Sequence, residues 1–80
     1  MWYVYVLKSL STQRHYTGST GNLERRLIEH NNGKTKSIKF LRPFVLIYKE
    51  EYNTRLEAIR REKFLKSGQG RQLLKEILGA

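Results

Sequence analysis

Arg26 and His30 lie one helical turn apart in a helix-like segment that follows a glycine-containing turn. Arginine donates hydrogen bonds to phosphate oxygens, and histidine moves or orients protons. Two tyrosines, Tyr5 and Tyr16, and a distant carboxylate, Glu62, supply the other groups that phosphodiester hydrolysis requires. These five side chains form the candidate catalytic set, with Glu62 as the ligand of one divalent metal ion.

Each candidate also has a structural interpretation. Tyrosines in strands often pack in a core with a satisfied hydroxyl group, and a histidine at the edge of an apolar helix face often only packs there. A phenol with an ordinary pKa of about 10 is a poor base at neutral pH, although a neighbouring cation lowers that pKa. The sequence leaves open whether Tyr5 or Tyr16 would be the general base.

Helical phase separates two adjacent arginines. The apolar positions of the first helix-like segment are Leu23, Leu27 and Ile28. At about 100° per residue, His30 projects within the Leu23/Leu27 arc, and Arg26 lies at the edge of that arc. Arg25 points away and is expected to be solvated. Thr20 or Asn22 could cap the start of this helix, and Gly33 is placed to end it in a left-handed conformation.

Glu62 stands out because it falls within the apolar stripe of a later helix, formed by Ala58, Ile59 and Leu65. A carboxylate in such a stripe is costly unless it is paired or binds a metal. It either serves a site or lies at the rim and pairs with a nearby arginine. The chain has no aspartate, which argues against a two-metal centre, so we expect one ion, Mg²⁺ or Mn²⁺.

The net charge of +9, from 16 Lys and Arg against 7 acidic residues, favours a polyanionic partner such as DNA, with RNA as the alternative. A solvated basic surface would have the same composition. There is no cysteine, no apolar run that could cross a bilayer and no secretory leader, so we expect a single cytoplasmic domain over residues 1–80 with no membrane association. The sequence is silent on oligomeric state.

The alternation of residue types predicts an α+β fold, within the broad α/β class, with the order β-β-α-β-α-α. Residues 2–7 are aromatic or β-branched, which predicts a strand buried on both faces, and residues 15–17 predict an antiparallel return strand. The apolar run 44–48 predicts a central strand at the heart of the sheet. Thr54 begins a capping box for a second helix, and residues 67–70 are expected to break that helix before a last amphipathic one.

A basic connector joins the first helix to the third strand. Its cations are Lys34, Lys36, Lys39 and Arg42. It shows little helical periodicity, so it is either a basic flap that binds a nucleic-acid backbone or an ordinary solvated loop. A Gly-Lys-Thr sequence within it resembles the end of a phosphate-binding P-loop, but position 28 is Ile where that motif requires its first glycine, which rejects a nucleotide site.

These residues together resemble the GIY-YIG nuclease domains of homing endonucleases, some restriction enzymes and a nucleotide-repair excinuclease. The resemblance covers essentially the whole chain. It rests on Tyr3-Val4-Tyr5, Tyr16-Thr17-Gly18, the Asn22–Arg26 segment with His30, and Ala58–Lys63. Tyr3, Val4 and Thr17 depart from the motif's name, as in the small stand-alone branch of the family, whose members consist of the domain alone and are similar to the repair excinuclease.

The resemblance implies a small three-stranded antiparallel sheet flanked by helices, and a metal-dependent endonuclease acting on DNA in repair or recombination. It implies that Tyr5 and Tyr16 are the motif tyrosines, with Gly18 as the motif glycine. Arg26 would face the phosphate, His30 would line the site, and Glu62 would be the only metal ligand. The family's usual second domain is absent, so specificity would come from shape, the basic connector or a protein partner. The alternative is a non-catalytic basic nucleic-acid-binding module with the same fold.

Overall fold

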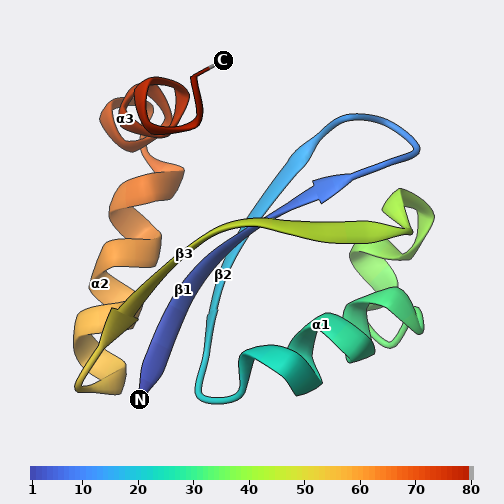
Figure 1. The fold of residues 1–80 in the computed structure, drawn as a ribbon, viewed down its shortest axis with the longest axis horizontal. Coiled ribbons are helices and arrows are strands. Elements are labelled where there is room, and N and C mark those ends of the chain that lie inside the picture. Colours follow the sequence, from blue (N-terminus) through green and yellow to red (C-terminus); the bar gives the residue numbers. More distant parts are fainter. Residues whose placement is uncertain (80) are drawn as a thin grey trace.

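The computed structural model describes residues 1–79 and confirms the predicted α+β fold and element order. The elements are β1 (Trp2–Ser9), β2 (His15–Thr20), α1 (Leu23–Asn31), the 3-10 helix η1 (Lys36–Leu41), β3 (Phe44–Tyr52), α2 (Arg55–Lys66) and α3 (Gly68–Leu78). The strands form one antiparallel sheet. Helices α1 and η1 lie on one side of the sheet, and α2 and α3 lie on the other (Figure 1). Among residues 1–79, no helix is both long and apolar enough to span a bilayer.

Strand β1 is the central strand, because the sheet order is β2-β1-β3. Its alternating residues supply two separate cores. Val4 and Val6 pack with residues of α2 and α3, whereas Tyr5 and Leu7 pack against the α1 side. The prediction that residues 2–7 are buried on both faces is therefore confirmed.

Strand β3 is an edge strand, so the prediction that residues 44–48 form the heart of the sheet is wrong. Val45 and Leu46 are 38% and 37% exposed. The error has a physical cause: an apolar run shows that residues avoid water, but long-range pairing decides which strand is central. Here both neighbours pair with β1, which leaves the outer side of β3 without a strand partner in residues 1–79.

The basic connector is not irregular over residues 36–41, which form η1. Ile38 and Leu41, three residues apart, both pack against the α1-side core. That spacing matches the three-residue repeat of a 3-10 helix, which brings residues i and i+3 onto one face. A search for the 3.6-residue period misses such a short repeat.

The predicted helix caps are largely present. Of the two candidates for α1, Asn22 is the cap, since its side chain accepts a hydrogen bond from Arg25 N at 3.0 Å. Gly33 has a φ of +76°, as expected beyond the helix end. Thr54 Oγ1 accepts from Glu57 N at 3.2 Å and begins α2. Of the three apolar positions of α1, Ile28 lies outside the core, because its side chain is 53% exposed.

The predicted break at residues 67–70 is limited to Ser67. This residue ends α2, and its hydroxyl oxygen caps α3 by accepting a hydrogen bond from Gly70 N at 3.2 Å. Gly70 belongs to the first turn of α3 and lies directly against the last turn of α2, where a Cβ atom would be 2.6 Å from the Phe64 carbonyl carbon. Glycine here permits a tight corner between two helices instead of a longer linker.

Candidate active site

Two strands of the sheet bring the motif tyrosine and the motif glycine together. Tyr5 on β1 is directly opposite Gly18 on β2 and is almost fully buried. A Cβ atom at Gly18 would lie 2.6 Å from Tyr5 Cζ, closer than real Cβ contacts come. Gly18 therefore has a steric role, since only glycine leaves room for the Tyr5 ring to lie across β2.

His30 on α1 connects the two tyrosines. Its Nε2 is 3.0 Å from the Tyr5 hydroxyl, its Nδ1 is 3.0 Å from Thr35 Oγ1, and its ring meets that of Tyr16 edge-on at a centroid distance of 5.3 Å. Burial, reinforced by the charge of Arg26, lowers the pKa of His30 below its ordinary value. A neutral, buried imidazole with both nitrogens engaged fixes the orientation of the tyrosines.

The pKa of the Tyr5 hydroxyl depends on its burial and on titratable groups from several elements. Burial raises its pKa to about 12. Arg26 opposes that increase, and the Tyr16 and Glu62 charges add to it. Side chains from β1, β2, α1 and α2 therefore act on one another electrostatically at the same place. At neutral pH Tyr5 is protonated and serves as a hydrogen-bond donor.

Arg26 lies at the edge of the apolar face of α1, as helical phase predicts, and its side chain is 40% exposed. Its carboxylate neighbour is Glu29, with Nη1 and Oε1 3.4 Å apart. An exposed pair of this length is weak, so the guanidinium group can turn to a phosphate at little cost. Arg25 is exposed, as predicted, but the prediction that it points away from Arg26 is wrong, because both residues line the same hollow.

Glu62 reaches the site from α2, on the opposite face of the sheet. Ser19 Oγ on β2 donates to Glu62 Oε1 at 2.5 Å, and Lys66 Nζ donates to Oε2 at 2.6 Å. The carboxylate is 20% exposed and pairs with a lysine, not with the arginine that the structural interpretation of the sequence named. Its partner Ser19 lines the same hollow as Arg26, whereas Glu62 itself does not line that hollow.

The hollow around Arg26 is concave and positively charged, with a volume of about 260 Å³. Its cations are Arg25, Arg26 and Arg55, and its lining also includes Ser19 and Gly21. Three guanidinium groups against the single carboxylate of Glu29 give the hollow a net positive lining. Such a hollow suits a phosphate group better than a neutral ligand.

Glu62 offers one carboxylate to a metal ion. Within residues 1–79 no cluster of three or more His or Glu side chains could enclose a metal. Mg²⁺ commonly binds through one or two carboxylates plus water and substrate phosphate oxygens. The Lys66 side chain, which donates to Oε2, is 50% exposed.

The four cations of the basic connector lie apart from Glu62. η1 lies beside the end of α1, across the sheet from α2 and α3 (Figure 1). None of the four lines the hollow around Arg26. The connector instead contributes Thr35, whose hydroxyl group holds His30. Nucleic-acid binding by the four cations remains a prediction.

Sequence reasoning missed Ser19, Thr35 and Lys66. Lys66 follows Glu62 by one helical turn, a spacing typical of ion pairs, and this signal could have identified it. Ser19 and Thr35 carry no such signal, because their partners lie 43 and 5 residues away and meet them only in the folded chain.

Comparison with known proteins adds to this geometry. A family model described as the GIY-YIG catalytic domain matches residues 1–75. UPF0213 protein SH2523 of Staphylococcus haemolyticus is 43% identical over 76 residues, which cover 94% of this chain and 92% of that protein. UPF0213 protein CPE1444 of Clostridium perfringens is 42% identical over 67 residues, covering 82% of this chain and 71% of that protein.

A solved structure is similar over the same region. It is the solution NMR structure of UPF0213 protein BH0048 from Bacillus halodurans, with a TM-score of 0.57 and 31% sequence identity. The similarity covers 96% of this chain and 85% of that one. The fold is therefore shared by small proteins of comparable length.

Proposed function

The chain belongs to the GIY-YIG catalytic domain family, and from this premise we propose that it is a divalent-metal-dependent endonuclease acting on DNA. The observation that carries the proposal is geometric: His30 contacts Tyr5 and Tyr16, and Ser19, which donates to Glu62, lines the same hollow as Arg26. Strongly interacting titratable groups beside a positively charged hollow are typical of functional sites. RNA is the alternative substrate, and a role in repair or recombination would follow from DNA cleavage.

In this proposal Arg26 binds the scissile phosphate and stabilises the charge that develops on its oxygens during the reaction. Its weak pairing with Glu29 leaves it free to do so. Arg25 at the rim contributes attraction but does not touch the reacting atoms.

The proposal assigns the general base to Tyr16. Tyr5, with a pKa of about 12, holds its proton too tightly to accept another group's proton at neutral pH. Tyr16 is only partly buried, so water and substrate can reach it. His30 and Tyr5 then position the phosphate and the Tyr16 ring.

Glu62 would hold the Mg²⁺ or Mn²⁺ ion, with Ser19 orienting the carboxylate. When bound, the ion supplies positive charge that neutralises the phosphate and the leaving oxygen. In the absence of a metal ion, the Lys66 ammonium group neutralises the Glu62 carboxylate.

The rival proposal is a basic nucleic-acid-binding module without turnover. One observation favours it: the Lys66 ammonium group already neutralises the only carboxylate at the site. If that ion pair persists in solution when metal is present, the site binds phosphates and cuts nothing.

Nicking of supercoiled plasmid DNA tests the proposal. We expect nicking with Mg²⁺ or Mn²⁺ and none with EDTA. Glu62→Gln should lower the rate about 100-fold or more, because it removes the metal's only carboxylate. Glu76→Gln, which makes the same charge change on an exposed residue of α3, is the matched control. Unchanged nicking in Glu62→Gln would overturn the metal assignment, and salt-sensitive binding without any nicking would establish the rival.

A further inference from the structure

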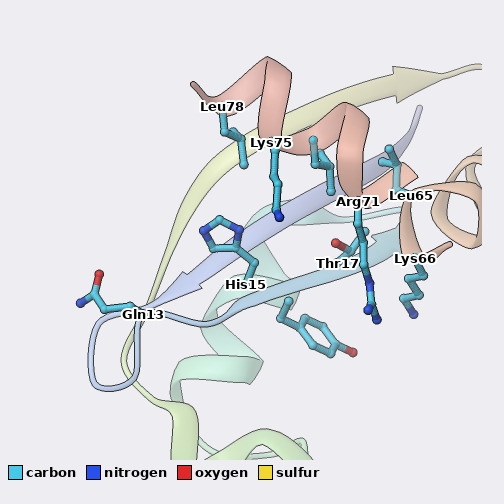
Figure 2. A pocket seen from close by; sticks show the side chains of 10 residues that line it. Gln13, His15, Thr17, Leu65, Lys66, Arg71, Lys75 and Leu78 are labelled. Carbon is cyan, nitrogen blue, oxygen red and sulfur yellow. The ribbon is translucent and has the colours of Figure 1, made fainter. Parts of the chain in front are cut away.

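A second hollow, of about 500 Å³, lies beside the candidate site between β2 and α3 (Figure 2). We call it the β2–α3 groove. Its rim carries Lys66, Arg71 and Lys75, and its floor is formed by Leu65, Leu74 and Leu78. Figure 2 shows the long side chains of Arg71 and Lys75 descending from α3 toward β2.

The rim is cationic and has no acidic counterpart. No carboxylate residue lines the groove, and within residues 1–79 neither Arg71 nor Lys75 forms an ion pair. The two residues are one turn apart on α3, so their charges lie on the same face of the helix. An arrangement of unpaired, exposed cations attracts a chain of phosphates.

The floor is apolar. Leu65 and Leu74 are buried and Leu78 is half-buried, whereas the ring of Tyr16 packs against His30 on the α1 side and is not part of this floor. Apolar surface beside cations suits the face of a nucleobase whose phosphates meet the rim. A base in a duplex is turned toward its partner and cannot reach such a floor, so the groove favours unpaired nucleotides.

Strand β2 contributes to both hollows. Tyr16 and Thr17 line the groove, and Ser19 lines the hollow that holds Arg26. Two residues of a strand span about 7 Å. Glu62 connects the two linings, because it accepts hydrogen bonds from Lys66 of the groove and from Ser19 of the hollow.

We infer that the β2–α3 groove binds an unpaired nucleotide next to the phosphate at the candidate active site, with Arg71 and Lys75 on its backbone and its base on the leucine floor. The inference rests on the proposed function, because it places the nucleotide next to the phosphate of the proposed nuclease site. It implies that the substrate is a polynucleotide that is single-stranded there. Binding, however, is measured without cleavage and is tested separately.

The test is fluorescence anisotropy of a short fluorescein-labelled single strand in EDTA, where no cleavage occurs. The double variant Arg71→Gln/Lys75→Gln should bind about tenfold more weakly, and its logarithmic salt slope should fall by about 1.4, or about 0.7 for each phosphate contact. The matched control is Arg60→Gln/Lys63→Gln, which removes the same charge from exposed positions of α2 that do not line the groove. It should change binding much less. Thermal unfolding of both variants checks that the fold is kept.

The floor is tested with strands of equal length and charge. Wild-type protein should bind an ordinary single strand at least about fivefold more tightly than an abasic strand, because the base buries apolar surface on the leucine floor. It should also prefer the single strand to a blunt duplex. Equal affinity for ordinary and abasic strands, or equal losses in the two double variants, would overturn the inference. So would displacement of the strand by polyglutamate of equal charge, which would indicate an acidic-protein surface.

The two proposals can fail separately. Metal-dependent nicking by the wild-type protein, with unchanged binding in Arg71→Gln/Lys75→Gln, would support the proposed nuclease activity and contradict nucleotide binding in the groove. Loss of binding in that variant, with no nicking by wild-type protein, would support the nucleotide-binding groove and contradict the proposed nuclease activity.

Discussion

The two faces of the sheet are built from different chemistry, although one strand supplies both. On the α2 and α3 side, Val4 and Val6 pack against aliphatic side chains, with Trp2, Tyr48 and Tyr52 around them. On the α1 side, Tyr5 packs against aromatic rings and bonds to His30. The centre of the first face is therefore an apolar core, with Glu62 at its margin, whereas the centre of the second face is a hydrogen-bonded tyrosine and histidine.

A polar face is stable only when its buried groups are satisfied. In residues 1–79, no buried side-chain nitrogen or oxygen atom lacks a hydrogen-bond partner. His30 shows how this is achieved, with the Tyr5 hydroxyl on one nitrogen and the Thr35 hydroxyl on the other. The α1 side can therefore hold a tyrosine and a histidine without the penalty of unpaired burial.

The largest expected effect is a loss of stability at the corner between α2 and α3. Gly70→Ala would place a methyl group 2.6 Å from the Phe64 carbonyl carbon, where backbone atoms cannot move aside. We expect a loss of at least about 3 kcal/mol in the free energy of unfolding. Urea denaturation followed by circular dichroism measures it. Gly68→Ala is the control, because a Cβ there meets nothing within 4 Å, and it should change stability by less than about 1 kcal/mol. Similar curves for the two variants would contradict the close packing of α2 and α3.

Neighbouring residues of β1 sharpen the comparison. Val6→Ala should destabilise the protein by about 2 kcal/mol through lost core packing, and nicking by the folded protein should persist. Tyr5→Phe should cost about 1 kcal/mol, because His30 loses a hydrogen-bond partner, yet it should lower nicking far more. Urea denaturation and the plasmid assay together separate the effects. The reverse pattern would show that the faces do not divide stability from activity.

A smaller effect should appear in the pH dependence of stability. The pKa of His30 is lowered in the folded protein by burial and Arg26, so the unfolded chain binds a proton more readily. The free energy of unfolding should be highest above about pH 6.5 and fall as the pH decreases below it, with a slope of at most about 1.4 kcal/mol per pH unit.

Urea denaturation between about pH 5.5 and 7.5, above the ordinary range of glutamate titration, measures that slope. His30→Gln should flatten it, and the exposed His15→Gln should not. A slope that survives in His30→Gln would mean that another group controls it.

Local signals predicted much of this molecule. The caps at Asn22 and Thr54 depend on residues three positions away, so the sequence shows both partners. The phase of α1 correctly predicted that Arg25 is more exposed than Arg26, but it did not predict that both line one hollow. The strand β1 was recognisable because its aromatic and β-branched residues favour a doubly buried strand.

Long-range features were not predictable in this way. The apolar residues 44–48 suggest a central strand, but pairing places β3 at the edge. The network around Glu50 gave no warning either: Arg61 donates to both of its oxygens, and the Tyr48 and Tyr52 hydroxyls bind there too. These contacts tie α2 to β3 and form only once the sheet is assembled.

The most direct test of the candidate site compares two adjacent arginines in the plasmid-nicking assay. Arg26→Ala and Arg25→Ala remove the same charge from neighbouring positions of α1, and both arginines line the same hollow. Only Arg26 acts on the Tyr5 hydroxyl. We predict that Arg26→Ala lowers the nicking rate about 100-fold or more and that Arg25→Ala stays within about fivefold of the wild type. Equal rates for the two variants would contradict a site built around Arg26.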